Sequence, residues 1–455
     1  MKKPMSLLLT LALLGSPALA ASTIAIVDSG TDFEHELLSG KSWTNKNEIA
    51  GNLVDDDRNG KVDDRHGWNF AEGSGTLFVR DHLNSINPII FPIFRIIANL
   101  QDGTITPDEK TFWEKNVTSL SAPQKQALLT HLNFYGQYSH GTHVAGIASA
   151  QSPDSQILVG RMFPDDPPRD YAHPQGLAVR TQGVIDYLYG MLATLTNATF
   201  DSASGYLNEN KVDVANYSLG VGLQMIAKQS LILRGTKEPT AEQISEETHR
   251  LFKQYEPKGK VWMAKAPATF FVIAAGNDGS DNDALPIFPG SVRAENAITV
   301  AATQGVSSLA SFSNYGKTSV DIAAPGVSIM SSVPSLNRSE LLPMSGTSMA
   351  APYVTGVAGR IKTINPDLTP AQNKAILMGT VDVKEWLKDK VISSGVVNAE
   401  RAYQAAQLSR TLPLDEALRL SREQVKDIAE ARSVLKTPEM KAPADLVEIA
   451  GKLIF

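Results

Sequence analysis

Five apolar runs, each followed by small or polar residues, constrain the fold of this chain most strongly. They lie in STIAIVDSG, QILVGRMF, VDVANYSLG, TFFVIAAGN and AITVAAT. Short apolar runs bounded by turn residues are typical of buried strands. Helical stretches separate them, among them TQGVIDYLYGMLATL and the segment that follows Ser348. Strands alternating with helices predict an α/β domain with a mostly parallel sheet and a functional site at the carboxyl ends of its strands.

The composition is that of a protein with a large core. Of the 455 residues, 42% are hydrophobic and 20% are charged, so we expect one large domain with additions, or two domains. The formal net charge is −6, and loss of Lys2 and Lys3 with a leader would change it to −8. Such an acidic balance disfavours a nucleic-acid partner.

Residues 1–20 have the pattern of a secretory signal peptide. Lys2 and Lys3 precede the apolar run Leu7–Leu14, and SPALA supplies small residues before an expected cut at Ala21. A membrane anchor is the alternative, but the run is much shorter than the ~20 residues that span a bilayer. We therefore expect a secreted or periplasmic protein with no membrane span after signal removal. Because the chain has no cysteine, its stability must come from core burial and bound ions.

Three regions stand outside the alternation of strands and helices. An insertion at about 71–139 leans toward helix, and its stretch Ile86–Leu100 has three possible roles: covering a cleft, contacting a partner or packing on the domain. A second, charged insertion lies at about 223–260. Residues 404–455 form a C-terminal extension, for which we expect an amphipathic helix with apolar residues at Ala417, Leu418, Val425, Ile428 and Val434.

Three polar residues lie in small or apolar surroundings, and together they can do chemistry. They are Asp28 in AIVDSG, His140 in YSHGTHVAG and Ser348 in SGTSMAAP. A serine hydroxyl becomes a nucleophile when an imidazole takes its proton and a carboxylate orients that imidazole. Taken singly, Ser348 is a helix N-cap candidate, Asp28 a loop residue and His140 a turn residue. Their combination favours a catalytic set.

A fourth residue, Asn277, follows the apolar strand of FFVIAAGNDGS. Its side-chain amide is suited to donate to a developing oxyanion beside the backbone N–H of Ser348. The alternative is a turn residue before Asp278 and Gly279. The dipole of a helix that begins at Ser348 favours the same negative charge.

Six segments, in order, resemble those of the subtilisin-like serine peptidases, the subtilase or S8 family. They are VDSG, HGTHVAG, SLG, AAGN, DIAAPG and SGTSMAAP, and the order Asp, His, Ser is that of subtilisin. The resemblance covers about Thr23–Tyr403 apart from the insertions. It implies a three-layer α/β/α fold with a mostly parallel central sheet, helical insertions and a helical C-terminal extension.

The resemblance also implies a role for each site residue. Asp28 orients, His140 is the general base, Ser348 is the nucleophile and Asn277 is the oxyanion donor. His143 is a structural neighbour, on a helix that starts there. The substrate, an extended polypeptide, pairs as an added strand with one segment, and a second segment walls the primary pocket. These substrate-binding residues are Ser218, Leu219 and Gly220, then Ala274, Ala275 and Gly276.

The stretch DDDRNGKVDD resembles the start of a calcium loop. Asp55, Asp57 and Asn59 alternate before Gly60, as in an EF-hand, but the twelfth position is His66 in place of a bidentate Glu. We expect Asp63 or Asp64 to complete the shell, with Asp64 as our choice. A solvated acidic turn is the alternative. Calcium is common in the family, and no organic cofactor is expected.

The leading hypothesis is an exported serine endopeptidase that acts through an acyl-enzyme. Family members usually carry a prodomain, whereas seven residues separate the expected cleavage point from Asp28. We therefore expect unaided folding, a separate chaperone or inhibitor protein, or help from a helical region. The alternative function is a catalytically silent or tightly restrained binding protein that acts through its helical insertions. An esterase is disfavoured because GTSMA is not a G-x-S-x-G elbow, and a zinc peptidase because HELLS at His35 lacks a second histidine.

Overall fold

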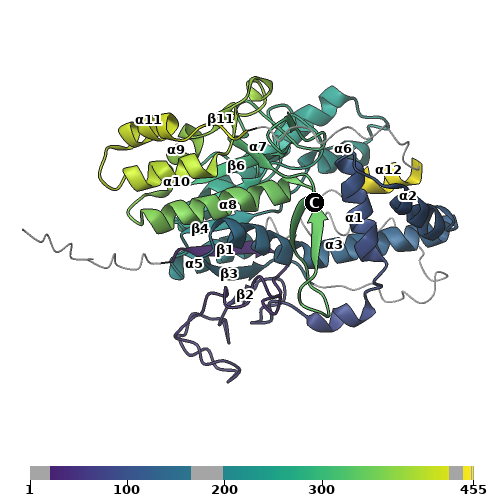
Figure 1. The fold of residues 1–455 in the computed structure, drawn as a ribbon, viewed down its shortest axis with the longest axis horizontal. Coiled ribbons are helices and arrows are strands. Elements are labelled where there is room, and N and C mark those ends of the chain that lie inside the picture. The colour runs from purple at the N-terminus through teal and green to yellow at the C-terminus, as the bar shows by residue number, and fades with distance from the viewer. Residues whose placement is uncertain (1–20, 165–197, 430–443, 452, 454–455) are drawn as a thin grey trace, which may run out of the picture.

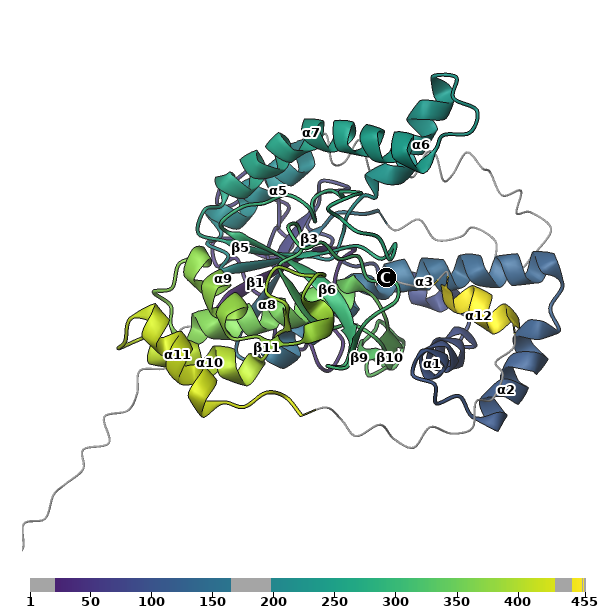
Figure 2. The same cartoon turned by 90° about the horizontal axis from the view of Figure 1, so that it is seen from above.

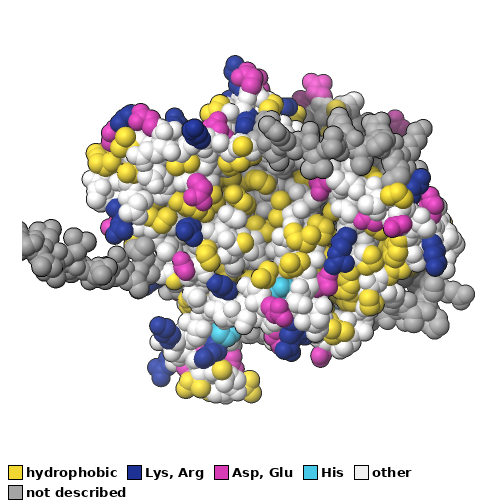
Figure 3. All heavy atoms as spheres, viewed as in Figure 1, with side chains coloured by type: hydrophobic (Ala, Val, Ile, Leu, Met, Phe, Trp, Pro, Cys, Tyr) yellow, Lys and Arg dark blue, Asp and Glu magenta, His cyan; other side chains and the backbone are white. Residues whose placement is uncertain are grey.

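A computed structural model describes residues 21–164, 198–429, 444–451 and 453. The expected signal peptide and the expected helix in TQGVIDYLYGMLATL lie outside these residues. No helix within the described ranges is long and apolar enough to cross a membrane. On the face seen in Figure 3, basic and acidic side chains are interspersed, and the described residues form no extended basic patch there.

A ten-stranded sheet forms the centre of the described structure (Figure 1). Its order is β11-β12-β8-β6-β5-β4-β1-β3-β2, with β7 beside β6. All neighbours are parallel except the pairs β11–β12 and β6–β7. Each of the five expected apolar runs forms a strand of this sheet. The strands are β1 (Thr23–Asp28), β2 (Gly67–Asn69), β3 (Gln156–Arg161), β4 (Val214–Tyr217), β5 (Phe270–Ala274), β6 (Ala297–Gln304), β7 (Ser308–Leu309), β8 (Ile322–Pro325), β11 (Asp382–Val383) and β12 (Gly395–Val396). 

Helices cover both faces of the sheet, and an antiparallel pair, β9 (Ile329–Ser332) and β10 (Leu341–Met344), lies outside it. Figure 2 shows α5 and α7 on one side and α8 to α11 on the other. The helices are α1 (Ile90–Gln101), α2 (Pro107–Trp113), α3 (Ala122–Gln151), α5 (Ala198–Glu209), α6 (Leu223–Leu233), α7 (Ala241–Lys265), α8 (Thr347–Ile364), α9 (Pro370–Gly379), α10 (Ala399–Leu408), α11 (Leu414–Gln424) and α12 (Ala444–Gly451). Shorter turns are the 3₁₀ segments η1 (Arg80–Ser85) and η3 (Glu385–Leu387) and the π-helical η2 (Glu114–Thr118).

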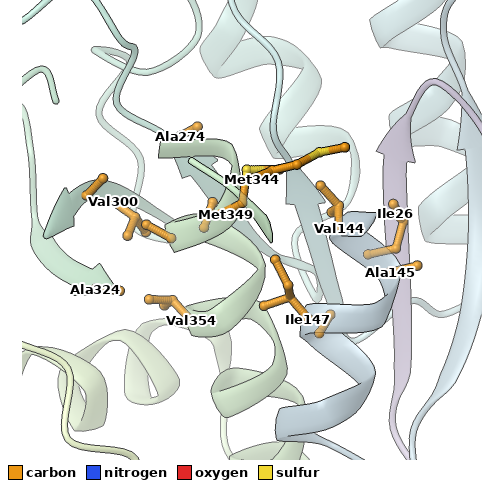
Figure 4. Close-up of a cluster of buried hydrophobic side chains, with 14 of the residues drawn as sticks. Ile26, Val144, Ala145, Ile147, Ala274, Val300, Ala324, Met344, Met349 and Val354 are labelled. Carbon is orange, nitrogen blue, oxygen red and sulfur yellow. The ribbon is translucent and has the colours of Figure 1, made fainter. Parts of the chain in front are cut away.

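Alternation along β1 explains the three layers. Ile24 and Ile26 are fully buried in the core that contains α3 and α8 side chains, whereas Ala25 and Val27 are fully buried in the core of α5 and α7. Successive strand residues point to opposite faces, so a strand buried on both faces must be apolar throughout. Figure 4 shows Ile26 beside side chains of α3, and Val354 of α8 in the same core. The expected α/β/α fold is confirmed.

The first insertion packs on the domain through an apolar helix face. Within Ile86–Leu100, helix α1 buries Ile93 and Ile97, and its Phe91 ring lies 5.5 Å from the ring of Tyr135 in α3. Packing is therefore the role that the structure supports for this stretch. Helix α3 begins at Ala122, so the prediction of a helix starting near His143 is wrong. The last part of the insertion and the segment with His140 form one continuous helix.

The remaining helical regions differ from expectation at their ends. The second insertion forms α6 and α7, and α7 continues through Pro257 to Lys265. Helix α10 crosses residue 404, where the sequence predicts the C-terminal extension to begin. The predicted amphipathic helix is too long, because α11 ends at Gln424 and Val425 is extended. The guanidinium of Arg401 donates to the carbonyl of Val425, and Ile428 N–H donates to Asp382, which stabilises a non-helical path. Val434 lies outside the described residues.

Candidate active site

The carboxylate of Asp28 and the imidazole of His140 are hydrogen-bonded in a buried position. Asp28 ends β1 and is 2% exposed, and its Oδ1 lies 2.7 Å from Nδ1 of His140. The backbone N–H of Ser29 also donates to this oxygen, at 2.7 Å. A proton on Nδ1 suits the carboxylate acceptor and leaves the Nε2 lone pair to act as a base.

Small residues fix helix α3 against the loop after β1. The N–H of Gly141 donates to the hydroxyl of Ser29 at 3.1 Å, and the N–H of Asp32 donates to the hydroxyl of Thr142 at 3.0 Å. Gly30 has φ of +113°, a conformation that favours glycine. These contacts hold the imidazole of His140 over the end of β1.

Ser348 lies at the beginning of helix α8, at the same edge of the sheet. Its hydroxyl donates to the carbonyl of Ser218 at 3.3 Å, and the hydroxyl of Ser218 donates to the carbonyl of Ser348 at 2.8 Å. Val27 of β1 pairs with Tyr217 of β4, so Ser218 follows β4 beside Asp28. Neighbouring strands lie ~4.8 Å apart, so this pairing brings Ser348 to the region of Asp28 and His140.

Ser348 is not the N-cap of α8. Gly346 is the N-cap residue, Thr347 is the first helical residue, and Ser348 follows it. Ser348 is 6% exposed. A residue at this position has a backbone N–H without an intrahelical acceptor. The sequence-based alternative of a capping role is therefore wrong, and the N–H of Ser348 is available for an anion.

Asn277 is oriented by a residue that the sequence analysis missed. The N–H and hydroxyl of Thr347 both donate to Oδ1 of Asn277, at 2.8 and 2.9 Å. In the part of the chain that is described, no partner is found for the Nδ2 amide of Asn277. The two bonds to Oδ1 fix the amide of Asn277 beside Thr347, the residue that precedes Ser348. Thr347 is adjacent to Ser348 in sequence, but the sequence alone does not indicate that Thr347 orients the amide of Asn277.

A second missed residue, Asn216, holds Ser218, the hydrogen-bond partner of Ser348, by a side-chain hydrogen bond. It is fully buried in β4, and its Nδ2 donates to the hydroxyl of Ser218 at 3.0 Å. Its Oδ1 accepts a hydrogen bond from the hydroxyl of Thr355 in α8, at 2.9 Å. A buried asparagine in an otherwise apolar strand, as in VANY, is the signal that could have identified it.

His143 has a structural position, as expected from the resemblance. It is fully buried, and its Nε2 lies 2.9 Å from the carbonyl of Leu342. Burial lowers the pKa of His143 to about 3, and the nearby charge of His140 acts in the same direction. The imidazole is therefore neutral near pH 7 and is tied to β10.

The two expected substrate-binding segments differ in how their backbone groups are used. The N–H and carbonyl groups of Ala275 and Gly276 are all hydrogen-bonded within the protein. The N–H of Gly276 donates to the hydroxyl of Thr347. Among the described residues, no partner is found for the backbone groups of Leu219 and Gly220. Leu219 and Gly220 follow β4 and offer the free edge that an added strand needs. Ser218 directly follows β4, and Ala274 ends the neighbouring strand β5.

Gly276 also shows why a side chain is excluded from the expected pocket wall. Its φ is +101°, and a Cβ there would lie 2.6 Å from Nδ2 of Asn314. Asn314 also accepts a hydrogen bond from the N–H of Asp278, at 2.8 Å. Ala275 and Gly276 thus present a fixed backbone surface, and a pocket wall formed by Ala274, Ala275 and Gly276 stays a prediction.

The acidic loop brings together a carboxylate set that differs from the expected one. Ligand oxygens of Glu48, Asp55 and Asp57 lie within 4.8 Å of one another. Three oxygen donors of this kind suit Ca²⁺. Glu48 was missed because it precedes the DDDRNGKVDD stretch, and it is 3% exposed. Among the residues described, the three carboxylates form a fitting site for a cation.

The other two expected ligands lie beside this set and are hydrogen-bonded. The Nδ2 of Asn59 donates to Asp57 at 3.3 Å and to Asp64 at 3.0 Å. Asn45 donates to the second oxygen of Asp64, at 2.9 Å. Burial raises the pKa of Asp64, and the hydrogen bonds from Asn59 and Asn45 oppose this shift. Ligation by Asn59 and Asp64 remains a prediction.

The fold and these side chains define an α/β protein with a buried Asp–His pair beside a helix-borne serine. The model of the subtilase family (Peptidase_S8) matches residues 20–403. The chain belongs to the subtilase family.

Relatives of known name are similar to part of this chain. An extracellular protease of Xanthomonas campestris pv. campestris is 27% identical over 369 residues, which are 75% of this chain and 53% of that protein. An extracellular basic protease of Dichelobacter nodosus is 29% identical over 279 residues, 58% of this chain and 39% of that protein. The chain thus spans about half or less of the length of these relatives.

Among solved structures, a cold-adapted subtilisin-like serine proteinase aligns with a TM-score of 0.42 and 20% identity, over 82% of this chain and 88% of that one. The A-subunit of the AB5 toxin from E. coli aligns with a TM-score of 0.44 and 20% identity, over 85% and 92%.

Proposed function

We propose that this chain is an exported serine endopeptidase that hydrolyses peptide bonds through Asp28, His140 and Ser348. The observation that carries the proposal is the buried hydrogen bond of 2.7 Å between Nδ1 of His140 and Oδ1 of Asp28. It prepares an imidazole base at the edge of the sheet where Ser348 lies in the first turn of α8. Membership of the subtilase family supports the same reaction.

The first half of the proposed reaction forms an acyl-enzyme. Nε2 of His140 takes the hydroxyl proton of Ser348, and Oγ of Ser348 attacks the scissile carbonyl carbon. The negative charge on the carbonyl oxygen is stabilised by Nδ2 of Asn277 and the backbone N–H of Ser348. The imidazolium, stabilised by Asp28, gives its proton to the leaving amine as the C–N bond breaks.

Water completes the reaction. His140 takes a proton from water, whose oxygen attacks the ester carbonyl, and the ester C–O bond then breaks as the proton returns to Oγ of Ser348. The substrate class is extended polypeptide, because the backbone of Leu219 and Gly220, which has no partner among the described residues, offers a strand edge. We further propose that Ser218 borders this edge and that Ala274, Ala275 and Gly276 wall the primary pocket.

A covalent probe tests the proposal directly. We expect a fluorophosphonate to label the wild-type protein, casein to be hydrolysed, and Ser348→Ala to abolish both. A folded wild-type protein that shows neither labelling nor hydrolysis contradicts the proposal and favours the silent binding protein instead. Purification of residues 21–455 without any added protein tests whether a separate chaperone or inhibitor is needed.

We also propose that Glu48, Asp55 and Asp57 hold a structural calcium ion, with Asn59 and Asp64 beside it. The ion would neutralise three carboxylates that lie within 4.8 Å of one another. It would fix the loop between β1 and β2 and takes no part in the bond-making steps. Isothermal titration of the chelator-treated protein with CaCl₂ tests this site.

Export is part of the proposal. The basic, apolar and small-residue pattern of residues 1–20 supports it, as do relatives named as extracellular proteases. In a bacterial host, we expect the exported protein to begin at Ala21 when its N-terminus is sequenced. Recovery only of cytoplasmic protein that retains residues 1–20 contradicts it.

A further inference from the structure

The last described helix, α12, lies against the first insertion. Figure 2 shows it beside α1, α2 and the N-terminal half of α3, far along the chain from all three. Leu446, Ile449, Ala450 and Leu453 are all at most 6% exposed and belong to the core that contains α1 and α3. We refer to α12 together with Leu453 as the latch.

One carboxylate joins the latch to three elements of the insertion. Asp445 accepts hydrogen bonds from the indole N–H of Trp113, at 3.2 Å, and from the hydroxyl of Thr118, at 3.2 Å. Its second oxygen accepts from the ammonium of Lys125 at 3.0 Å. Trp113 is fully buried, so its N–H needs an acceptor and Asp445 supplies it. Burial alone would raise the pKa of Asp445, but these three donors lower it.

The insertion in turn contacts the segment that leads to the nucleophile. At the C-terminal end of α1, Gln101 accepts a hydrogen bond from the hydroxyl of Ser345, three residues before Ser348. The same hydroxyl accepts a hydrogen bond from the N–H of Ser328 at 2.8 Å, and the hydroxyl of Ser328 donates to Ala98 of α1 at 3.3 Å. Helix α1 therefore braces the loop in front of α8.

The insertion also includes the first part of the helix that carries the base. Lys125, which binds the latch, and His140 lie on the same continuous helix, α3. Tyr135, between them, is fully buried and donates to the carbonyl of Pro334 at 2.7 Å. The latch thus contacts one helix that reaches Ser345 and another that carries His140.

We propose that the latch is an intramolecular clamp that holds α1 and α3 together and so keeps Ser348 and His140 aligned, with Gln101 as a positioning residue. This inference rests on the proposed peptidase function. Its physical basis is that a packed helix pair transmits a shift at one end to groups bonded at the other. A misplacement of about 1 Å at a reacting group can lower the rate by ~100-fold.

Substitution in the latch tests the clamp in the full chain. Leu446→Asp puts a charge in a fully buried site, so we expect the latch to detach, seen as faster hydrogen exchange at residues 444–451. We expect kcat to fall by roughly 10- to 100-fold with KM little changed, because the substrate edge at Leu219 is not touched. Val383→Asp, at a 65% exposed site, is the matched control and should leave both unchanged.

A peptide with the sequence of residues 441–455 separates docking from general instability. Added to the Leu446→Asp protein, this peptide should restore most of kcat. The same peptide with the substitutions Asp445→Ala and Leu446→Asp should not. If Leu446→Asp prevents folding, the milder variant Leu446→Ala replaces it in this test. The added peptide should restore kcat of that variant too. A detached latch with unchanged kcat overturns the clamp.

Gln101 provides a second, finer test. Gln101→Glu keeps the acceptor oxygen for Ser345 and should retain kcat, whereas Gln101→Leu removes it and should lower kcat about 10-fold without raising KM. Equal kcat in the two variants overturns the positioning role. Labelling of the wild type by the fluorophosphonate tests the peptidase function separately from the clamp. An unlabelled wild type overturns the peptidase function and the clamp with it, and a labelled wild type with unaffected variants overturns the clamp alone.

Discussion

A Cβ atom on Gly141 would lie 2.2 Å from the carbonyl oxygen of Gly30, so helix α3 and the loop after β1 meet backbone to backbone. This contact lies one residue beyond His140 and two beyond Asp28. The hydrogen bond between the acid and the base therefore depends on the absence of a side chain at position 141.

Gly141→Ala should lower activity by a larger factor than its loss of stability alone would cause. The methyl group forces α3 away from Gly30 and lengthens the contact between His140 and Asp28. We expect kcat/KM to fall by on the order of 100-fold, measured with a peptide substrate. Gly205→Ala in α5 is the control, because a Cβ there meets nothing within 4 Å. Unchanged kcat/KM in Gly141→Ala contradicts this account of the site.

Asn277→Leu should lower kcat while leaving KM nearly unchanged. The substitution removes an amide donor that acts on the oxyanion, and loss of one such donor typically costs ~100- to 1,000-fold in kcat. Thr347→Val keeps Asn277 but removes one of the two bonds to its Oδ1, so we expect a smaller loss. A rise in KM with unchanged kcat in Asn277→Leu would assign Asn277 to substrate binding instead.

The buried His143 should make stability fall with acid. Its pKa is lowered to about 3 in the folded protein, against ~6.5 in an unfolded chain, so the unfolded state binds more protons between these values. The free energy of unfolding is then highest above pH ~6.5 and falls toward pH 3, by up to ~1.4 kcal/mol per pH unit from this group. Urea unfolding at pH 7 and pH 5 measures the change, which should be smaller in His143→Gln. Equal changes in the two proteins contradict the role of His143.

Calcium removal should lower the thermal midpoint. An ion that binds only the folded state at 100 times its Kd adds ~2.7 kcal/mol to the free energy of unfolding. We expect EDTA to lower the Tm of the wild type by several degrees. We expect Glu48→Gln to have a lower Tm than the wild type and to respond little to EDTA. Glu385→Gln, at an exposed site, should behave like the wild type. A Tm that does not respond to EDTA contradicts the site.

The sheet could be predicted from the sequence because its strands are buried on both faces. Residues such as Ile24 and Val27 contribute to separate cores, so neither can be polar. The acid and the base could be predicted because their neighbours are small. Gly30 and Gly141 allow the close approach that the Asp28–His140 hydrogen bond requires.

Other features depend on contacts between distant segments, which local patterns do not contain. Helix α3 continues through His140 because Tyr135 and its neighbours pack on α1, so the start at Ala122 is fixed by tertiary packing. Glu48 joins Asp55 and Asp57 only when the loop closes. Helix α11 stops at Gln424 because Arg401 binds the following carbonyl. In each case the residue that determines the local structure is distant in the sequence or belongs to another element of the fold.

The continuity of α3 also changes the electrostatic field around the base. A helix that began at His140 would place its unpaired N–H groups and positive dipole end beside the imidazolium that forms during the reaction. The helix begins at Ala122 instead, so about eighteen residues, or ~27 Å of helix, separate that positive end from His140. The field of a helix terminus fades within about one turn. In this chain the helix end is therefore too far away to repel an imidazolium at His140, whereas the carboxylate of Asp28 lies 2.7 Å from its ring.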